Sequence, residues 1–350
     1  MRKLLLAIEK LYVDWRNFRL LRRGWHARIC PYVAFGTPTR LTVQLRVMLE
    51  KEAGSLDFVR RGITSIRSKQ LPNVKVLVRK PESNYSTTLV TDHGGYIFDE
   101  IEIELPLGWS EVELSLIKGQ KLVRGKRSVD MSSVDEIVKL RTFIVDDTEA
   151  SVGILSDIDD TILVSNAPAP LIALQNLLFK SPFKRKPVRK MPEFYRYLAE
   201  KLPTAPFFYL SAGPWNQFGF TKRFLASHDF PFGPIIMQDI GPDDNKIFAN
   251  TRFHKKRYLD KLLKLYPNIS WLLIGDDGQH DIEIYKNFTL ENPKNVTAIL
   301  IRHLTAVQQV IQSGLPFANH TGPETSLVPI IHALDGEEMR DLVEKMLTSR

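Results

Sequence analysis

A short apolar run that ends in a dense acidic cluster constrains this chain more than any other stretch. Residues 153–162 read Gly-Ile-Leu-Ser-Asp-Ile-Asp-Asp-Thr-Ile, so three aspartates fall within four residues at the end of the run. Carboxylates this close together repel one another and resist burial unless a cation neutralises them. The stretch therefore predicts a strand whose end holds a divalent ion.

Beyond residue 151, short apolar segments alternate with amphipathic ones. The expected strands are residues 153–158, 206–210, 235–237, 271–274 and 296–301, and the expected helices include 192–202, 215–227 and 255–266. This alternation predicts a parallel sheet wrapped by helices. Ligands of such sheets bind beyond the carboxyl ends of the strands. The residues that follow each strand are therefore the candidate functional residues.

Acidic, hydroxyl and lysine side chains follow several of these expected strands. They are Asp157, Asp159 and Thr161 after the first, Ser211 after the second, Asp276, Asp277 and Asp281 after the fourth, and Lys255 at the expected start of the preceding helix. Alone, each has an ordinary explanation as a turn or capping residue. Together they supply oxygen ligands for Mg²⁺ and a cation for a transferring phosphoryl group. The set predicts a metal-dependent phosphoryl-transfer site.

The order of these residues resembles the four motifs of the haloacid dehalogenase (HAD) phosphatase superfamily: Asp-x-Asp-x-Thr, Ser, Lys and Gly-Asp-x-x-x-x-Asp. More narrowly, residues 156–162, 209–216 and 274–285 resemble the catalytic domain of the actin-patch phosphatidate phosphatase family, in its bacterial form. The resemblance covers residues 151–304 and extends weakly upstream. It implies a HAD-like Rossmannoid sheet with helices on both faces.

The resemblance also implies a catalytic role for each matched residue. Asp157 would be the nucleophile that forms an aspartyl-phosphate. Asp159 would protonate the leaving alkoxide and later activate water, held in place by Thr161. Ser211 would bond a phosphoryl oxygen, and Lys255 would neutralise the nucleophile and the transferring group.

The metal implied by the family is Mg²⁺. Its expected ligands are Asp157, the backbone carbonyl of Asp159, Asp276 and Asp281. Because Mg²⁺ keeps several waters in proteins, two or three carboxylates are enough to hold it. The ion and the lysine together would offset acids that could not otherwise share one pocket.

Four further residues are expected to support the site or contact the substrate: Thr161, Gly213, Asp277 and Arg302. Two positions depart from the family pattern, since Asp277 replaces an expected Ser and Gln238 an expected Arg. Lys256 competes with Lys255 for the lysine role. We prefer Lys255 because it follows His254, as in the family, and lies on the apolar stripe of its helix.

The N-terminal half has a different character. Residues 2–23 predict an amphipathic basic helix, which can dock on its own protein's core or lie in a membrane interface. Residues 31–147 contain alternating strands at 41–47, 74–78 and 111–116, separated by Gly- and Pro-containing turns. They predict a small antiparallel β-sandwich-like accessory domain with a structural or docking role.

Basic residues are concentrated in two places. Residues 1–30 hold eight Lys or Arg against two acids, and residues 171–190 hold six with no acid. Such patches suit phosphate, anionic lipid or nucleic acid, or are simply solvated faces. We expect peripheral membrane contact through residues 1–30 and 180–190 rather than nucleic-acid binding.

Size and composition limit the remaining possibilities. A chain of 350 residues favours more than one domain, and its single cysteine, Cys30, excludes an intramolecular disulfide. No apolar run approaches the roughly 18 residues that span a bilayer, and the apolar start is too short for a signal peptide. We expect a cytoplasmic protein, peripheral to the inner face of the membrane.

These expectations combine into one functional hypothesis. The domains are expected at residues 1–30, 31–147, 148–320 and 321–350, the last a helical tail, with a small cap near 163–204. The chain is expected to be a Mg²⁺-dependent phosphoric monoester hydrolase of lipid metabolism that converts phosphatidate to diacylglycerol. One alternative is a soluble or nucleic-acid phosphomonoester as substrate, and another is a catalytically silent scaffold. The sequence leaves the oligomeric state open.

Overall fold

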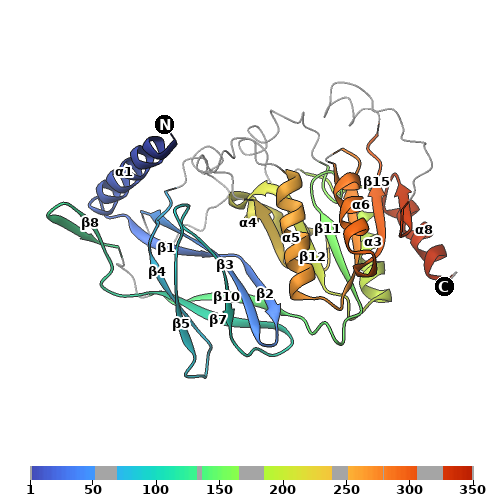
Figure 1. Cartoon of the computed structure of the whole chain (residues 1–350), viewed down its shortest axis with the longest axis horizontal. Coiled ribbons are helices and arrows are strands. Elements are labelled where there is room, and N and C mark those ends of the chain that lie inside the picture. The colour runs from blue at the N-terminus through green and yellow to red at the C-terminus, as the bar shows by residue number, and fades with distance from the viewer. Residues whose placement is uncertain are drawn as a thin grey trace. The chain divides into compact units, whose positions relative to one another are not determined.

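The computed structural model describes residues 2–51, 69–131, 136–164, 185–238, 251–278, 280–305 and 326–348. These residues form two compact units, one running up to Val145 and one beginning at Asp146. Each unit has its own sheet, with one described helix in the first unit and several in the second (Figure 1). Within the described part of the chain, no helix is both long enough and apolar enough to cross a membrane.

The first unit is one helix and a β-rich layer. Its elements are α1 (Arg2–Leu21), β1 (His26–Pro31), β2 (Val33–Thr37), β3 (Arg40–Glu50), β4 (Lys75–Arg79), β5 (Ser86–Val90), β6 (Tyr96–Glu102), β7 (Gly108–Leu116), β8 (Lys121–Arg124), β9 (Arg127–Asp130) and β10 (Val138–Ile144). Eight strands form one sheet: seven follow the hydrogen-bonded path β1-β3-β2-β10-β7-β4-β5, and the eighth, β6, pairs with β3 off this path. The neighbouring strands are antiparallel, as expected, except for the parallel pair β2 and β10. Strands β8 and β9 form a separate hairpin.

Helix α1 uses one face to dock on this unit. Val13, Phe18 and Leu21 are buried, and the helix packs against β3, β8 and β9. Buried Asn17 donates its side-chain amide to the backbone carbonyl of Gln70 at 2.9 Å, which fixes the helix on the domain. One face of the helix therefore docks on its own domain, which is one of the two alternatives that the sequence left open.

The second unit is an α/β domain. Its elements are β11 (Val152–Asp157), α3 (Met191–Lys201), β12 (Phe207–Pro214), η2 (Trp215–Gln217), α4 (Phe218–Ser227), β13 (Ile235–Gln238), α5 (Thr251–Leu265), β14 (Ser270–Asp276), α6 (Asp281–Glu291), η5 (Pro293–Asn295), β15 (Val296–Arg302), β16 (Ile330–Ala333) and α8 (Gly336–Thr348). All five expected strands are present, and each end lies within four residues of its expected position. Helix α5 begins before Lys255, so this lysine lies inside the helix rather than at its start.

The sheet of this unit has the order β13-β12-β11-β14-β15-β16, and every neighbouring pair is parallel. Helices α5 and α6 lie in front of the strands in Figure 1. The strands are apolar and buried along nearly their whole length, as expected when both faces of a parallel sheet are covered. After β11 the chain adds β12 and β13 on one side and then β14, β15 and β16 on the other, so the strand order reverses between β11 and β14. Such a switch point leaves a crevice at the carboxyl ends of the strands.

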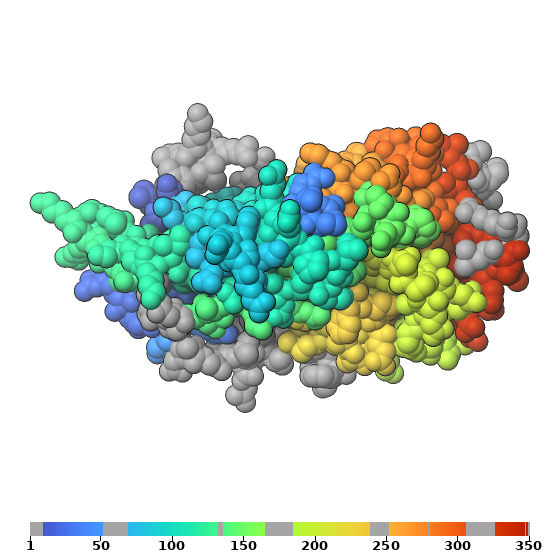
Figure 2. All heavy atoms as spheres, turned by 90° about the horizontal axis from the view of Figure 1, so that it is seen from below, coloured from blue at the N-terminus to red at the C-terminus, as the bar shows by residue number. Residues whose placement is uncertain are grey.

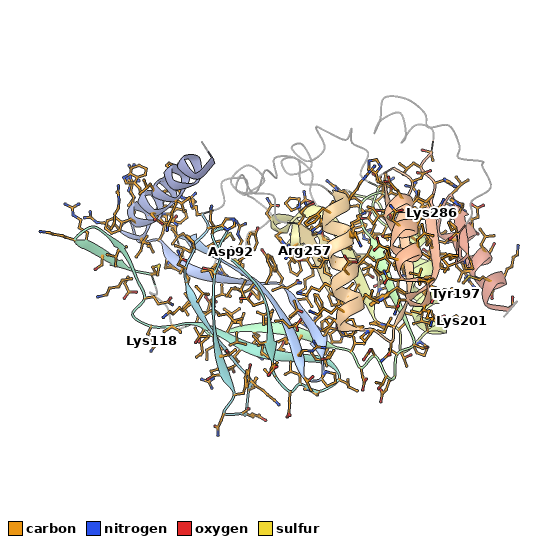
Figure 3. The ribbon with its side chains drawn as sticks, viewed as in Figure 1. Asp92, Lys118, Tyr197, Lys201, Arg257 and Lys286 are labelled. Carbon is orange, nitrogen blue, oxygen red and sulfur yellow. The ribbon has the colours of Figure 1, made fainter. Side chains whose placement is uncertain are left out.

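The C-terminal segment completes this sheet. The sequence predicted only helices beyond residue 320, whereas residues 330–333 form β16, which pairs with β15. Helix α8 packs on α3, where the Arg340 guanidinium lies 4.9 Å from the ring centre of Tyr197, labelled in Figure 3. Residues 165–184 of the expected cap lie outside the described residues, and its later part forms α3.

Candidate active site

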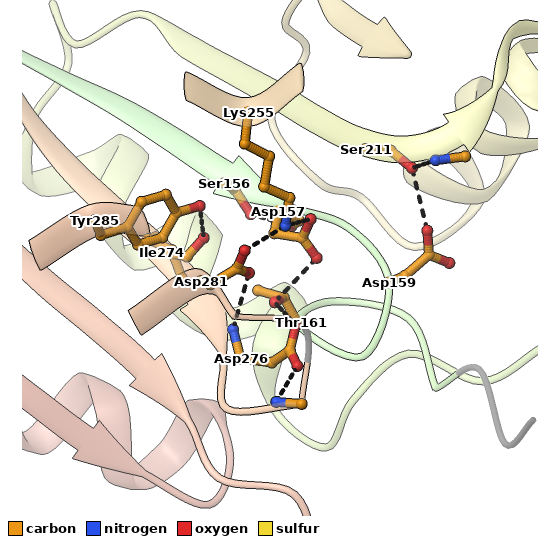
Figure 4. Close-up of polar contacts among 12 residues, drawn as sticks. Ser156, Asp157, Asp159, Thr161, Ser211, Lys255, Ile274, Asp276, Asp281 and Tyr285 are labelled. Atoms are coloured by element: carbon orange, nitrogen blue, oxygen red, sulfur yellow. Dashed lines mark hydrogen bonds and ion pairs between the residues drawn. The ribbon is translucent and has the colours of Figure 1, made fainter. Parts of the chain in front are cut away.

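Three buried carboxylates meet at the carboxyl end of the parallel sheet. Asp157 ends β11, Asp276 ends β14, and Asp281 begins α6. Each is at most 1% exposed, and their nearest oxygens lie within 4.8 Å of one another. Figure 4 shows how the two neighbouring strands and one helix deliver these side chains to one point. The strand-end pattern of the sequence predicted this meeting.

Lys255 neutralises part of this acidic cluster. It is fully buried on α5, its Nζ lies 2.5 Å from Asp157 Oδ1, and it forms a second ion pair with Asp281. Lys256 instead points to the surface and pairs with Asp260 and Glu291. Of the two candidate lysines, the structure therefore brings Lys255 to the acids.

Burial and charge together perturb the titration of this cluster. Burial raises the pKa of Asp157 well above its ordinary value, and the neighbouring acids add to that effect while Lys255 opposes it. Burial and the charges of Asp281 and Asp157 raise the pKa of Asp276 in the same way. Burial opposes the charge of Lys255, but the three acids outweigh it and raise its pKa. The cluster thus carries more acid than its lysine can balance.

A second polar group lies beside the cluster. Ser211, on β12, donates a hydrogen bond from Oγ to Asp159 Oδ2 at 3.1 Å and accepts one from the backbone N–H of Gly213 at 2.9 Å (Figure 4). A Cβ at Gly213 would lie 3.0 Å from Ser211 Oγ, so glycine suits this close turn. Asp159 is half-buried, and burial raises its pKa, while the charge of Arg185 opposes that rise.

The carboxylate of Asp159 is separate from the three-acid cluster. It bonds to Ser211, so only its backbone carbonyl remains as an expected metal ligand. Thr161 was expected to hold Asp159 in place. Its hydroxyl instead makes long contacts to Asp157 Oδ2 at 3.4 Å and Asp276 Oδ2 at 3.5 Å. Thr161 therefore links the two strand ends that carry the cluster.

Two residues expected to contact substrate have structural partners. The two oxygens of Asp277 accept hydrogen bonds from the backbone N–H of Leu304 at 2.9 Å and from the ring of His303 at 2.7 Å, which ties β14 to the segment after β15. Arg302 is buried and donates to the backbone carbonyl of Asp160 at 2.7 Å. This bond braces the loop that follows Asp157. Gln238 is buried at the end of β13.

Sequence reasoning missed the residues whose hydroxyl groups bond to the backbone of the strands that carry the acids. Ser156 Oγ donates to the backbone carbonyl of Asp157 at 2.5 Å and lies 2.5 Å from the hydroxyl of Tyr195. Tyr285 donates to the backbone carbonyl of Ile274 at 3.2 Å, to one side of the cluster (Figure 4). These hydroxyl groups lie within apolar stretches of the sequence, where nothing marks them as functional. Tyrosine in particular is common in protein cores for its packing alone.

Gly275, the first residue of the Gly-Asp-x-x-x-x-Asp motif, was given no role of its own from the sequence, although its position is tightly constrained. A Cβ there would lie 2.6 Å from Asp281 Oδ2 and 2.7 Å from Asp281 Cβ. We expect Gly275→Ala to displace the Asp281 carboxylate and weaken divalent-cation binding by about tenfold or more, measured by titration calorimetry with Mg²⁺. The control is Gly219→Ala, whose Cβ meets only ordinary contacts. Equal affinities in the two variants would contradict this role for Gly275.

The donor set fits a hard divalent cation. Three carboxylates within 4.8 Å, buried and only partly balanced by Lys255, form an oxygen-rich anionic pocket of the kind that Mg²⁺ prefers. The group can therefore hold a divalent metal ion. Asp281 gains additional support from its position in the first turn of α6, where the helix dipole favours negative charge.

The region that carries this site matches a known family. Residues 152–303 match the model of the family described as phosphatidate phosphatase APP1, catalytic domain. Phosphatidate phosphatase APP1 of Saccharomyces cerevisiae is 29% identical over 152 residues, which cover 43% of this chain and 26% of that protein. An uncharacterized protein of Schizosaccharomyces pombe is 21% identical over 192 residues, or 50% of this chain and 31% of that protein.

The chain therefore aligns with about a quarter to a third of the length of these relatives. Among solved structures, the apo structure of Bacteroides uniformis beta-glucuronidase 3 aligns with 80% of this chain and 35% of its own, at 8% identity and a TM-score of 0.21. The family match spans β11 to the end of β15, together with all three acids and Lys255. Residues 152–303 belong to the phosphatidate phosphatase APP1 catalytic-domain family.

Proposed function

We propose that this chain is a Mg²⁺-dependent phosphatidate phosphatase that acts through an aspartyl-phosphate on Asp157. The observation that carries the proposal is the buried meeting of Asp157, Asp276, Asp281 and Lys255 at the switch point of a parallel sheet. Phosphoryl transfer needs mainly alignment and charge neutralisation, which this arrangement supplies. The lipid substrate is inferred from the family to which residues 152–303 belong.

The proposed reaction has two steps. In the first, an Asp157 oxygen attacks phosphorus, the bond to the glycerol oxygen breaks, and Asp159 gives that oxygen a proton, so diacylglycerol leaves. In the second, Asp159 takes a proton from water, whose oxygen attacks phosphorus and releases phosphate from Asp157. Ser211 donates its hydroxyl proton to Asp159 in the substrate-free site, and in this scheme it turns that proton to a phosphoryl oxygen once the substrate binds.

The charged groups of the cluster have distinct tasks in this scheme. Lys255 holds Asp157 by its ion pair and neutralises charge as the phosphoryl group arrives. Asp157, Asp276, Asp281 and the backbone carbonyl of Asp159 would hold the divalent ion. When bound, that ion supplies electrostatic stabilisation of the transferring phosphoryl oxygens.

Activity measurements test the proposal directly. We expect the full chain with Mg²⁺ to release phosphate from phosphatidate in detergent micelles, and to stop when EDTA removes the metal. Soluble phosphomonoesters such as p-nitrophenyl phosphate should be turned over more slowly at equal concentration. Turnover of soluble esters without any release from phosphatidate would overturn the lipid assignment, and no turnover of either would overturn the enzymatic one.

We further propose that α1 contacts the inner face of a membrane. One face of the helix is buried, yet Leu11, Tyr12 and Trp15 on the opposite face are 68%, 57% and 39% exposed. Exposed Arg19 lies beside Trp15 on that face, and exposed Arg22 and Arg23 follow the end of the helix. These charges suit an interface of anionic lipid. The β8–β9 hairpin, which packs beside α1 and projects at the left of Figure 2, adds four exposed Lys or Arg: Lys121, Arg124, Lys126 and Arg127.

The second basic stretch supports membrane contact less well. Residues 180–184 lie outside the described residues, and Arg185 is buried. Arg189 pairs with Asp335 and Glu337, so its charge is already balanced on the protein's own surface. We therefore assign membrane contact to the α1 face and the adjoining β8–β9 hairpin.

Flotation with liposomes tests this assignment. We expect the full chain to float with phosphatidylcholine vesicles that contain phosphatidate, and the triple variant Leu11→Ser, Tyr12→Ser, Trp15→Ser to remain in the dense fraction. The control carries Val90→Ser and Leu107→Ser, two exposed apolar side chains elsewhere on the same unit. Flotation of the triple variant like the wild type would contradict the proposal.

A further inference from the structure

We propose that Arg185 is a substrate-binding residue, whose guanidinium takes the phosphate dianion on the Asp159 side of the site. The inference rests on the proposed function, because it concerns how that same site recognises its substrate. Sequence reasoning placed Arg185 in a basic surface patch with Lys186, Arg189 and Lys190. The structure separates it from those neighbours, because it is buried while they are exposed.

Backbone pairing places Arg185 beside the catalytic loop. The segment that begins with Arg185 pairs with the end of that loop: Val164 donates to the carbonyl of Lys186 at 3.1 Å, and Val188 donates to the carbonyl of Ile162 at 3.0 Å. Leu163 bridges to Asp159 on one side and to Pro187 on the other. Arg185 is thus held within the fold of the loop that carries Asp159.

The guanidinium itself is fixed by an aromatic ring. Its Cζ lies 5.1 Å from the ring centre of Phe220 on α4, and the residue is only 9% exposed. The charges that act on it most strongly are those of Asp159 and Asp160. Stacking on a ring orients the planar group while leaving its N–H edge available for other bonds.

The Nε–H group of Arg185 is a buried donor without a hydrogen-bond partner among the described residues. Buried polar groups nearly always have such partners, so this exception requires explanation. No ion pair joins Arg185 to Asp159 or Asp160 within the described part of the chain, although their charges interact. A buried cation with an unused donor beside a reacting carboxyl group is arranged to meet an anion that arrives from outside.

Charge balance supports the same assignment. Lys255 and a divalent ion would offset the three acids of the cluster, and Asp159 carries a proton while it acts as the acid. A phosphate monoester brings two further negative charges. The guanidinium supplies a planar, permanently charged fork that matches two phosphate oxygens. Arg185 would therefore favour dianionic phosphomonoesters over singly charged diesters.

Substitutions on one segment provide the test. We expect Arg185→Gln to raise KM for phosphatidate and the inhibition constant of inorganic phosphate together, by about 10- to 100-fold, as expected for losing bonds to a charged group. Arg185→Lys keeps the positive charge but loses the planar guanidinium, so its KM and inhibition constant should lie between those of the wild type and Arg185→Gln. Arg189→Gln, an exposed arginine four residues on, is the matched control and should remain within about twofold.

A direct binding measurement separates this proposal from the function on which it rests. Calorimetry with inorganic phosphate and Mg²⁺ on the full chain needs no turnover, and should show weaker binding in both Arg185 variants than in the control. An unchanged phosphate affinity in Arg185→Gln and Arg185→Lys would overturn the proposal. The proposal would also be overturned if the Arg185 variants lost kcat and shifted its pH profile while KM stayed unchanged. That pattern would mean that Arg185 only positions Asp159.

Discussion

Asp157→Asn is expected to lower phosphate release from phosphatidate by about 10⁴-fold or more. The two side chains have nearly the same shape, so the fold is preserved while the nucleophilic carboxylate is lost. Because the three buried acids outnumber Lys255, removing one of them should leave the melting temperature in Mg²⁺-free buffer at or above that of the wild type. Initial rates and thermal melts of the same preparations measure both effects.

The matched control for this variant is Asp229→Asn. Asp229 is exposed, lies after α4, and has a positive φ of 56° that asparagine also accepts. It should keep nearly wild-type turnover. Retention of substantial turnover in Asp157→Asn would contradict the covalent scheme, and a large fall in its melting temperature would contradict our account of the charge balance.

Lys255→Met is expected to have the largest effect on stability. It removes the single lysine that pairs with both Asp157 and Asp281, and leaves buried acids uncompensated. Breaking a buried ion pair on one side commonly costs about 3–5 kcal/mol in the free energy of unfolding. Turnover should also be lost. Since a bound cation stabilises the state that binds it, excess Mg²⁺ should recover part of the lost stability.

The neighbouring lysine offers the control for this experiment. Lys256 is half-exposed and pairs with Asp260 and Glu291 on the surface, so Lys256→Met should change stability little. Denaturant unfolding with and without Mg²⁺ measures all three proteins. Similar losses in both variants, or no recovery of Lys255→Met by Mg²⁺, would contradict the assignment of Lys255 as the cation of the acidic cluster.

The sequence predicted the acidic cluster because a parallel sheet has a simple geometry. Asp157 and Asp276 end neighbouring strands, and the first residues after such strands must share one edge of the sheet. Their meeting needed no knowledge of side-chain contacts. The choice between Lys255 and Lys256 was harder, since adjacent positions on a helix differ only in which face they occupy, and the helix start was placed too late.

Features that depend on tertiary contacts could not be predicted from strand positions in the sequence. Strand β16 is four residues long, too short for its alternation to stand out in the tail. Asp277 resembled a site residue by its position, but it bonds to His303 and Leu304. Arg185 lay within a basic run, and composition cannot separate the one arginine that folds inward from its exposed neighbours.

One measurement tests the central claim most directly: acid quenching of the full chain during turnover of phosphatidate labelled in its phosphate. We predict protein-bound label that hydroxylamine removes, as expected of an acyl phosphate, and that maps to the peptide containing Asp157. The label should be absent when EDTA replaces Mg²⁺ and absent from Asp157→Asn. Phosphate release without any trapped label on the wild type, or equal labelling of Asp157→Asn, would contradict the account.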